Sequence, residues 1–329
     1  MLNAPCNVNK KDCLKQNEVL TTSNESIMLT AGDASRSKKT AVAKGYWKDD
    51  HINAMVPGPI ERKTPEINRG YYARTEAVWN IVKNFVSNNS DAQVVSLGCG
   101  LDTLYWRLLS SDYHCHKYVE VDFPTLVKKK VHIIQNSDKL DSLLLEKKAS
   151  LSTPAIYSKY YNLFGCDLKY TNLLDNMLQN CDLDFKKPTL FLTECVLMYM
   201  KVEVSNKVLS YASEKFQNSV FVSYDALNMN DRFGHTMINN LKQRQCWLEG
   251  IQPCSSQDTQ KERFSKSGWK FTNVQTMWEI YLKLSNRTNI ERLEFLDETE
   301  LLEQLLNHYC LIVAYNDENN SYLTDCFKN

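Results

Sequence analysis

The sequence predicts a doubly wound α/β fold built on a mostly parallel sheet. Short runs that are nearly continuous in apolar residues alternate along the chain with segments of helical periodicity. This is the pattern of parallel strands that are joined by right-handed crossover helices and covered on both faces. Several of the apolar runs end in an acid or a glycine turn. Such residues gather at the carboxyl edge of a parallel sheet, where ligands bind.

Composition narrows the class of protein. The 329 residues are 43% hydrophobic and 24% charged, which is typical of globular domains. The 39 basic residues match the 39 acidic ones, which argues against a bulk basic surface for nucleic acid. No apolar run approaches the ~20 residues of a membrane span, and the N-terminus has no apolar signal region. We therefore expect neither nucleic acid nor a membrane as a partner.

The cysteines point to a reducing compartment. Their number, eleven, is odd, and no CxxC pair occurs. Several lie in or beside apolar runs, where a thiol behaves as a small hydrophobe: Cys99, Cys166, Cys195 and Cys310. The cluster His114, Cys115, His116 lacks a second ligand pair at zinc spacing, so we expect no metal. A cytoplasmic protein is the simplest expectation.

The N-terminal third should consist of a tail and a helical cap. Residues 1–33 are polar and without period, which predicts a disordered tail. Residues 34–90 are expected to form the cap. Within it, apolar residues at helical spacing predict a helix over about 71–85 that carries Arg74 on its polar face. The residues at that spacing are Val78, Ile81, Val82 and Phe85.

The α/β core is expected over residues 91–315, followed by a C-terminal tail at 316–329, so that 34–329 forms one domain. The runs that predict strands are 93–100, 117–123, 160–168, 188–199, 219–227 and 308–315. Apolar residues at helical spacing predict helices over 204–216 and 301–306.

A glycine turn and an acid predict a nucleoside-bearing cofactor. Gly98 and Gly100 follow the first strand, where two glycines let the backbone turn tightly beside a ligand. Asp122 follows Gly100 by 22 residues, at the end of the second strand. An acid at that place can accept hydrogen bonds from both ribose hydroxyls.

The neighbouring residues disfavour a dinucleotide. The third glycine of such a site is replaced by Thr103, and Asp102 puts a negative charge where a diphosphate would bind. That charge is compatible with the cationic end of S-adenosylmethionine. Asp167 and Leu168 end the third strand, where an adenine edge could bind, and Glu194 ends the fourth, over the expected sulfonium. The structural alternatives are a helix N-cap for Asp167 and an ion pair for Glu194.

Longer motifs resemble those of the leucine carboxyl methyltransferase family, in order from about Ala34 to Tyr315. They are "KTPEINRGYYAR", "SLGCGLDTLYWRL", "YVEVDFP", "TECVLMYM", "NMNDRFGHTMINNL" and "LEFLDETELLEQLLNHYC". The resemblance implies transfer of a methyl group from S-adenosylmethionine to the C-terminal leucine carboxylate of type 2A protein phosphatase catalytic subunits. It also implies a sheet of seven strands, the last antiparallel, with an N-terminal helical cap and an inserted helical lid.

The resemblance assigns site residues position by position. The positions that match the family's cofactor-binding residues are Lys38, Arg74, Gly98, Asp122, Asp167, Leu168 and Glu194. The segment around Lys38 matches loosely, which leaves Lys39 as the alternative.

A carboxylate acceptor simplifies the expected chemistry. Its pKa of ~3.5 means that it is ionised at neutral pH, so no general base is required. None of the six histidines shows a convincing base arrangement. Arg74 and Lys38 would hold the carboxylates, unless they are solvated surface charges, and Tyr199 would donate a hydrogen bond to the acceptor, unless it packs in the core. The spacing does not decide the role of Arg69. Arg74 and Tyr199 are therefore the catalytic candidates.

Three rival functions remain. The related tRNA-modifying carboxymethyltransferase carries a long extra domain, for which 329 residues leave no room. A nicotinamide oxidoreductase is disfavoured by Thr103 and Asp102. A non-catalytic phosphatase-binding module is disfavoured by the intact Gly98, Asp122 and Glu194. We expect a monomeric enzyme.

Overall fold

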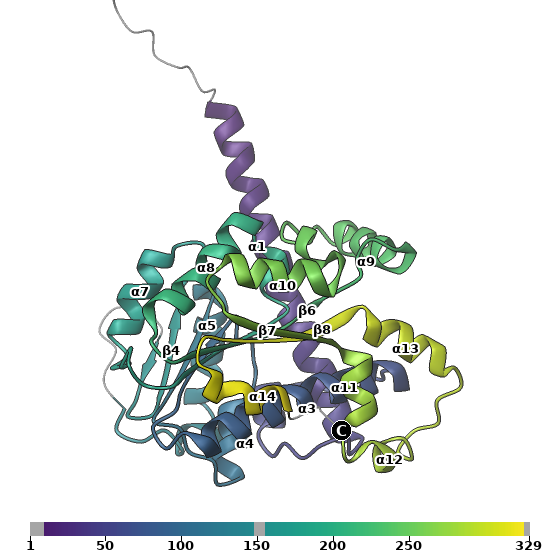
Figure 1. Cartoon of the computed structure of the whole chain (residues 1–329), viewed down its shortest axis with the longest axis horizontal. Helices are drawn as coiled ribbons and strands as arrows, with labels where there is room; N and C mark the ends of the chain where they lie inside the picture. Colours follow the sequence, from purple (N-terminus) through teal and green to yellow (C-terminus); the bar gives the residue numbers. More distant parts are fainter. Residues whose placement is uncertain (1–9, 148–154, 326–329) are drawn as a thin grey trace, which may run out of the picture.

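The computed structural model describes residues 10–147 and 155–325, which form an eight-stranded sheet with helices on both faces (Figure 1). The strand order is β3-β4-β2-β1-β5-β6-β8-β7. The strands are β1 (Gln93–Leu97), β2 (Lys117–Asp122), β3 (Ile156–Tyr157), β4 (Tyr161–Gly165), β5 (Thr189–Glu194), β6 (Ser219–Ala226), β7 (Phe271–Thr276) and β8 (Tyr309–Tyr315). Strands β4, β2, β1, β5 and β6 are parallel, whereas β8 is antiparallel to both of its neighbours.

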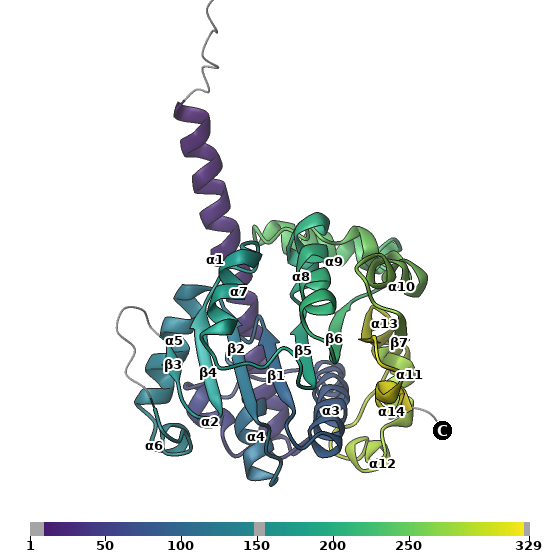
Figure 2. The same ribbon diagram turned by 60° about the vertical axis from the view of Figure 1, so that its left-hand side comes forward.

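The doubly wound prediction is confirmed. One core cluster joins the sheet to α3 (Pro65–Asn88), α4 (Leu104–Ser110) and α5 (Pro124–Gln135). A second cluster joins the other face to α7 (Thr171–Gln179), α8 (Val202–Lys215) and α10 (Gln257–Lys266) (Figure 2). Strands β1, β2 and β6 are buried along their whole length, which explains their nearly continuous apolar sequence.

The expected number of seven strands is wrong by one. The additional strand, β3, has two residues and pairs antiparallel with β4 at the edge of the sheet. The six expected runs contain β1, β2, β4, β5, β6 and β8, but the run at 188–199 extends beyond β5 into the 3-10 helix η1 (Leu197–Tyr199). Strand β7 was not predicted, because its sequence FTNVQT is mostly polar. Such a sequence suits its place at the other edge of the sheet, where it is only half-buried.

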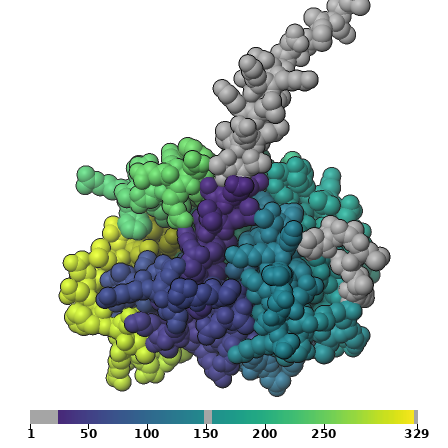
Figure 3. Space-filling model, turned by 180° about the vertical axis from the view of Figure 1, so that it is seen from behind, coloured from purple at the N-terminus to yellow at the C-terminus, as the bar shows by residue number. Residues whose placement is uncertain are grey.

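The expected tail over residues 1–33 is also wrong from Lys10 onward, because α1 (Lys10–Ala43) is one helix. Its C-terminal part packs on the protein body: Ala41 is fully buried, and Thr40 Oγ1 donates to the Glu61 carbonyl at 2.9 Å. Figure 3 shows this part (purple) between segments drawn in green and in teal. Contacts with distant segments hold this C-terminal part of the helix.

The segment between β6 and β7 adds three helices, of which α9 is the lid helix. Between β6 and β7 lie α9 (Arg232–Gln243), η2 (Gln252–Ser255) and α10, and Asp231 caps α9 by accepting from Gly234 N at 2.8 Å. The remaining elements are α2 (Ile52–Met55), α6 (Asp138–Asp141), η1 (Leu197–Tyr199), α11 (Met277–Lys283), α12 (Arg287–Ile290), α13 (Thr299–Asn307), η3 (Glu318–Ser321) and α14 (Tyr322–Asp325). Among the described residues, no helix is long and apolar enough to span a membrane.

Candidate active site

A cavity of about 900 Å³ opens at the carboxyl edge of the parallel strands. Its walls come from α1, from the turns that follow β1, β2, β4 and β5, and from the lid helix α9. Every site residue expected from the sequence lines it: Lys38, Arg74, Gly98, Asp122, Asp167, Leu168, Glu194 and Tyr199. The structure therefore brings together residues that are up to 161 positions apart, from Lys38 to Tyr199.

The glycine turn is shaped by its neighbours. Gly98 has a φ of +73°, and a Cβ atom there would lie 2.4 Å from Cγ2 of Val196. Gly98 N donates to the Val121 carbonyl at 2.8 Å, which ties the turn to β2. Only glycine fits both the backbone angle and the space.

Asp122 is fixed beside this turn. Its Oδ2 accepts from Gly100 N and its Oδ1 from Phe123 N, both at 2.7 Å. Burial raises the pKa of Asp122, against the opposing effect of these two backbone hydrogen bonds. A carboxylate has about four lone-pair sites, so this one can still accept hydrogen bonds from a ligand in the cavity.

Four charged side chains meet at α1: Lys38 and Arg74 are buried, and Asp102 and Glu194 are partly buried. Lys38 Nζ lies 3.1 Å from Asp102 Oδ1 and 3.3 Å from Glu194 Oε2, and Arg74 Nε lies 2.5 Å from the same Glu194 oxygen. Burial lowers the pKa of Lys38, but the charges of Asp102 and Glu194 outweigh it and the pKa rises. Burial raises the pKa of Asp102, but the positive charges of Lys38 and Lys130 outweigh this effect and lower the pKa to about 2. Two cations thus balance two anions.

Arg74 is held on several sides. Its guanidinium carbon lies 4.7 Å from the ring centre of Tyr224 and 5.7 Å from that of Tyr71. Its Nη2 donates to the Glu194 carbonyl at 3.4 Å, while Nη1 lies 3.9 Å from the sulfur of Cys195. The side chain is 9% exposed as a residue, so it is not a solvated surface arginine. Its pKa is raised well above the usual value, because Glu194 outweighs the effect of burial.

The two basic alternatives lie outside the cavity lining. Lys39 Nζ donates to the carbonyls of Val56 and Gly58, at 2.8 and 2.6 Å. Arg69 Nη2 donates to the carbonyls of Glu291 and Glu294, at 3.0 and 2.8 Å. These lysine and arginine side chains therefore hold loops, and the lysine that reaches the cavity is Lys38.

Asp167 and Leu168 line the cavity on the turn after β4, which is three strands away from β5 and Glu194 in the sheet. Asp167 Oδ2 pairs with Lys169 Nζ at 2.8 Å, and its Oδ1 accepts from Lys169 N at 3.1 Å. The N-cap of the following helix α7 is Tyr170, so the alternative of Asp167 as a helix cap does not hold.

The part of the cavity next to the lid helix α9 is apolar, and most of its residues were not predicted from the sequence. It is lined by Met198, Tyr199, Phe233, Met237, Leu241 and Tyr309. Phe233, Met237 and Leu241 recur at i, i+4, i+8 on α9, and this apolar stripe was the available signal. Nothing in the sequence marked Tyr309 or the α1 residues that also line the cavity.

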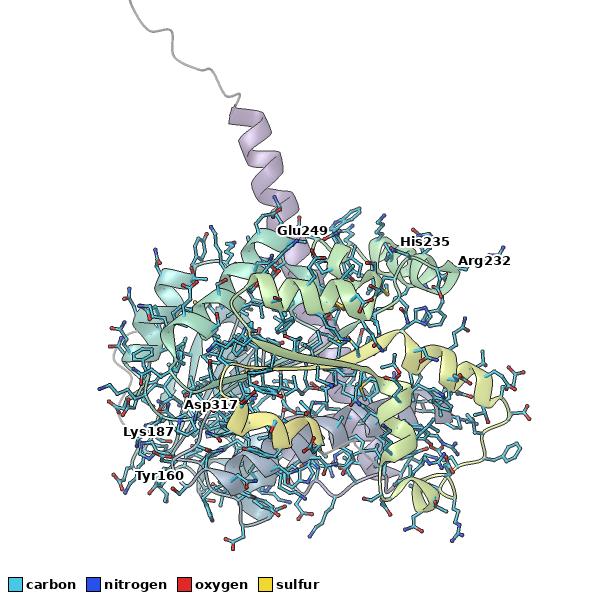
Figure 4. All side chains as sticks on the ribbon, in the orientation of Figure 1. Tyr160, Lys187, Arg232, His235, Glu249 and Asp317 are labelled. Atoms are coloured by element: carbon cyan, nitrogen blue, oxygen red, sulfur yellow. The ribbon has the colours of Figure 1, made fainter. Side chains whose placement is uncertain are left out.

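The histidines lie away from the cavity lining. None of the six histidines lines the cavity. His308 binds Asp231 at 2.9 Å, and His235 projects from the outer side of α9 (Figure 4). Cys115 is buried, which raises its pKa to about 12, and the described residues contain no group of three or more potential metal ligands.

Sequence comparisons agree on one family. Residues 26–213 match the sequence model described as "Leucine carboxyl methyltransferase". Leucine carboxyl methyltransferase 1 of Rattus norvegicus is 41% identical over 298 residues, covering 88% of this chain and 90% of that protein. The homologue from Arabidopsis thaliana is 35% identical, covering 88% and 89%. tRNA wybutosine-synthesizing protein 4 of Homo sapiens is 30% identical, but only 45% of its length is covered.

Solved structures bear on the fold alone. A DUF574 family protein from Streptomyces avermitilis has a TM-score of 0.54 at 13% identity, covering 87% of this chain and 97% of that one. A putative methyltransferase from Thermobifida fusca has a TM-score of 0.51 at 11% identity, covering 80% and 92%. The arrangement of strands and helices is therefore that of a methyltransferase sheet.

Proposed function

The chain belongs to the leucine carboxyl methyltransferase family, and we propose that it methylates the C-terminal leucine carboxylate of a type 2A phosphatase catalytic subunit, using S-adenosylmethionine. The observation that carries the proposal is the pairing of Arg74 and Lys38, both buried, at a cavity that no histidine lines. Such a site suits anionic carboxylates that need to be held but not deprotonated.

The cavity fits the methyl donor. Asp122 is anchored by Gly100 and Phe123 and retains acceptor capacity for ribose hydroxyls. Gly98 and Val196 both line the cavity, and a side chain at residue 98 would strike Val196, so the turn keeps its shape only with glycine. Asp102 contributes a negative charge, which disfavours a diphosphate but not a sulfonium. S-adenosylmethionine supplies an electrophilic methyl group when it is bound.

Each residue that lines the cavity would then have a separate role in binding. Asp122 would bind the ribose, Asp167 and Leu168 the adenine side, and Gly98 would let the backbone approach the ligand. Lys38 and Arg74 would hold carboxylates, since arginine offers a planar two-point grip. Glu194 offsets the positive charge of both cations and lies at the end of β5.

The acceptor needs alignment rather than activation. A terminal carboxylate with a pKa of ~3.5 is already ionised. Catalysis then depends on holding its oxygen in contact with the methyl carbon and on excluding water. Tyr199, which lines the cavity and whose pKa is raised by burial, would donate a hydrogen bond to this carboxylate.

We further propose that the protein acts as a monomer in the cytoplasm. Eight described cysteines are free thiols, in keeping with a reducing compartment. A tRNA-modifying role is less favoured, because the chain is 41% identical to the leucine carboxyl methyltransferase of Rattus norvegicus but 30% identical to the human wybutosine-synthesizing protein.

Transfer of a labelled methyl group tests the proposal. The wild-type protein should label a type 2A phosphatase catalytic subunit and should fail to label the same subunit without its terminal leucine. Equal labelling of both would contradict the leucine assignment. Stabilisation by S-adenosylhomocysteine without labelling of either would favour a non-catalytic binding module.

A further inference from the structure

Three tyrosines, Tyr71, Tyr199 and Tyr309, line the cavity. Among the described residues, the hydrogen-bond partner of the Tyr309 hydroxyl is the sulfur of Met237, at 3.9 Å. A thioether is a weak acceptor. Tyr309 therefore holds a donor that has no strong acceptor.

A second tyrosine fixes the position of this ring. Tyr224 on β6 is 4% exposed, and it stacks on Tyr309 with the ring centres 5.2 Å apart and the planes at 13°. The same Tyr224 ring contacts the guanidinium of Arg74, at 4.7 Å. Tyr309 and Arg74 are thus held against one rigid side chain. Their relative position requires no rearrangement when a ligand enters.

The surroundings of Tyr309 suit the end of an apolar peptide. Phe233 and Met237 come from the lid helix α9 and Leu305 from α13, and all three line the same cavity. The acids that would bind the ribose and the adenine belong to the turns after β2 and β4, which lie on the far side of β5 and β6 from β8 and Tyr309 in the order of the sheet. The Tyr309 end is therefore the one that remains for the acceptor.

The chemistry of a phenol also suits an anionic nucleophile. Burial raises the pKa of Tyr309 well above its usual value, so the hydroxyl stays protonated and donates. A hydrogen bond to a carboxylate is among the stronger ones. A neutral donor orients the carboxylate while leaving more negative charge on the attacking oxygen than a second cation would.

We propose that Tyr309 donates a second hydrogen bond to the carboxylate of the acceptor, in addition to that from Tyr199, and thereby orients the carboxylate at the lid end of the cavity. This inference rests on the proposed function, because it assumes a leucine carboxylate as the acceptor. Tyr224 acts through Tyr309 and Arg74 as a positioning residue.

The variant Tyr309→Phe tests the role, because it keeps the ring and the stack on Tyr224 and removes only the hydroxyl. We expect kcat/KM for the phosphatase catalytic subunit to fall about tenfold or more, through a higher KM, since a hydrogen bond to a charged group is lost. The affinity for S-adenosylhomocysteine, measured by calorimetry, should stay within about twofold, because the acids expected to bind it belong to the turns after β2 and β4.

Tyr315→Phe is the matched control. Tyr315 lies at the other end of β8, away from the cavity lining, and stacks on Phe271 at 5.2 Å, so its hydroxyl should not matter for turnover. An unchanged kcat/KM in Tyr309→Phe would overturn the inference and leave the proposed function standing. A parallel loss of S-adenosylhomocysteine binding would also overturn it, by placing the hydroxyl at the cofactor. A wild-type protein that labels no leucine-ending acceptor would overturn the proposed function, and the inference with it.

Discussion

Arg74 Nε lies 2.5 Å from Glu194 Oε2, which joins a helix outside the sheet to the carboxyl end of a central strand. Both side chains are only 11% exposed, so the pair is largely desolvated. Breaking such a pair from one side is costly, because it leaves a buried charge with less compensation. Lys38 is the second cation on the same carboxylate. The three side chains act together, and substitutions at Arg74 therefore test the site as a whole.

Arg74→Lys should lose activity severely while the protein remains folded. Lysine keeps the charge but lacks the planar fork that binds a carboxylate at two points. Arg74→Ala should lose S-adenosylhomocysteine binding as well. Methyl transfer and calorimetry on both variants measure the effects, with exposed Arg62→Ala as the control, for which a change in stability below ~0.5 kcal/mol is expected. Normal turnover by Arg74→Ala would contradict the proposal that Arg74, together with Lys38, holds carboxylates in the cavity.

Asp122→Asn should weaken S-adenosylhomocysteine binding at least tenfold. The amide removes the charge and sets an N–H against the ribose hydroxyls or against Gly100 N, which now donates to Oδ2. Each hydrogen bond to a charged group contributes ~1.5–3 kcal/mol. Calorimetry on the folded variant measures the loss, and the exposed Asp112→Asn serves as the control. Equal affinities for wild type and Asp122→Asn would exclude the ribose role.

Gly98→Ala should destabilise the protein and weaken cofactor binding. The left-handed backbone at φ +73° costs an alanine ~1–2 kcal/mol, and the contact with Val196 adds ~1–3 kcal/mol. Gly58→Ala is matched, because its φ is +106° but nothing lies within 4 Å of the added Cβ. Urea unfolding should show the larger loss of stability at Gly98. When Val196→Ala is added to Gly98→Ala, only the loss caused by the contact with Val196 should be recovered. Equal losses at the two glycines would contradict the close approach of Val196.

The chemical step should be independent of pH between about pH 6 and 8.5, because the acceptor is already ionised and no histidine lines the cavity. Burial raises the pKa of Cys195 to about 12, so this thiol does not titrate in that range either. Single-turnover rates measure the profile. An inflection near pH 6.5 that disappears in one histidine variant would reveal a general base.

Asp225 should make folding stability fall as pH rises. Burial raises its pKa from 3.8 to about 6, with Arg263 acting in the opposite direction. Because the folded state binds this proton more tightly than the unfolded state, the contribution is complete below pH 3.8 and is lost through pH 6. The total is about 3 kcal/mol. Urea unfolding from pH 4 to 8 should show this component in the wild type and not in Asp225→Asn. Parallel curves for the two proteins would contradict it.

Much of the fold follows from local sequence. Buried parallel strands must be apolar on both faces, so β1, β2, β4, β5 and β6 could be identified without tertiary information. The acids and glycines at their ends marked the cofactor side of the cavity. The half-buried edge strand β7 and the two-residue β3 carry too few apolar residues to be found in this way.

The sequence by itself determined the sheet, the family and the residues at the strand ends, whereas only the tertiary structure decided which side chains meet. Lys38 and Lys39 are neighbours, but successive residues of a helix point in different directions, and only Lys38 reaches Asp102 and Glu194. Near its C-terminal end, α1 contacts remote segments, as Thr40 does with Glu61. The stack of Tyr309 on Tyr224 joins an antiparallel strand to its neighbour. Such contacts are made by packing between distant segments, and local periodicity carries no trace of them.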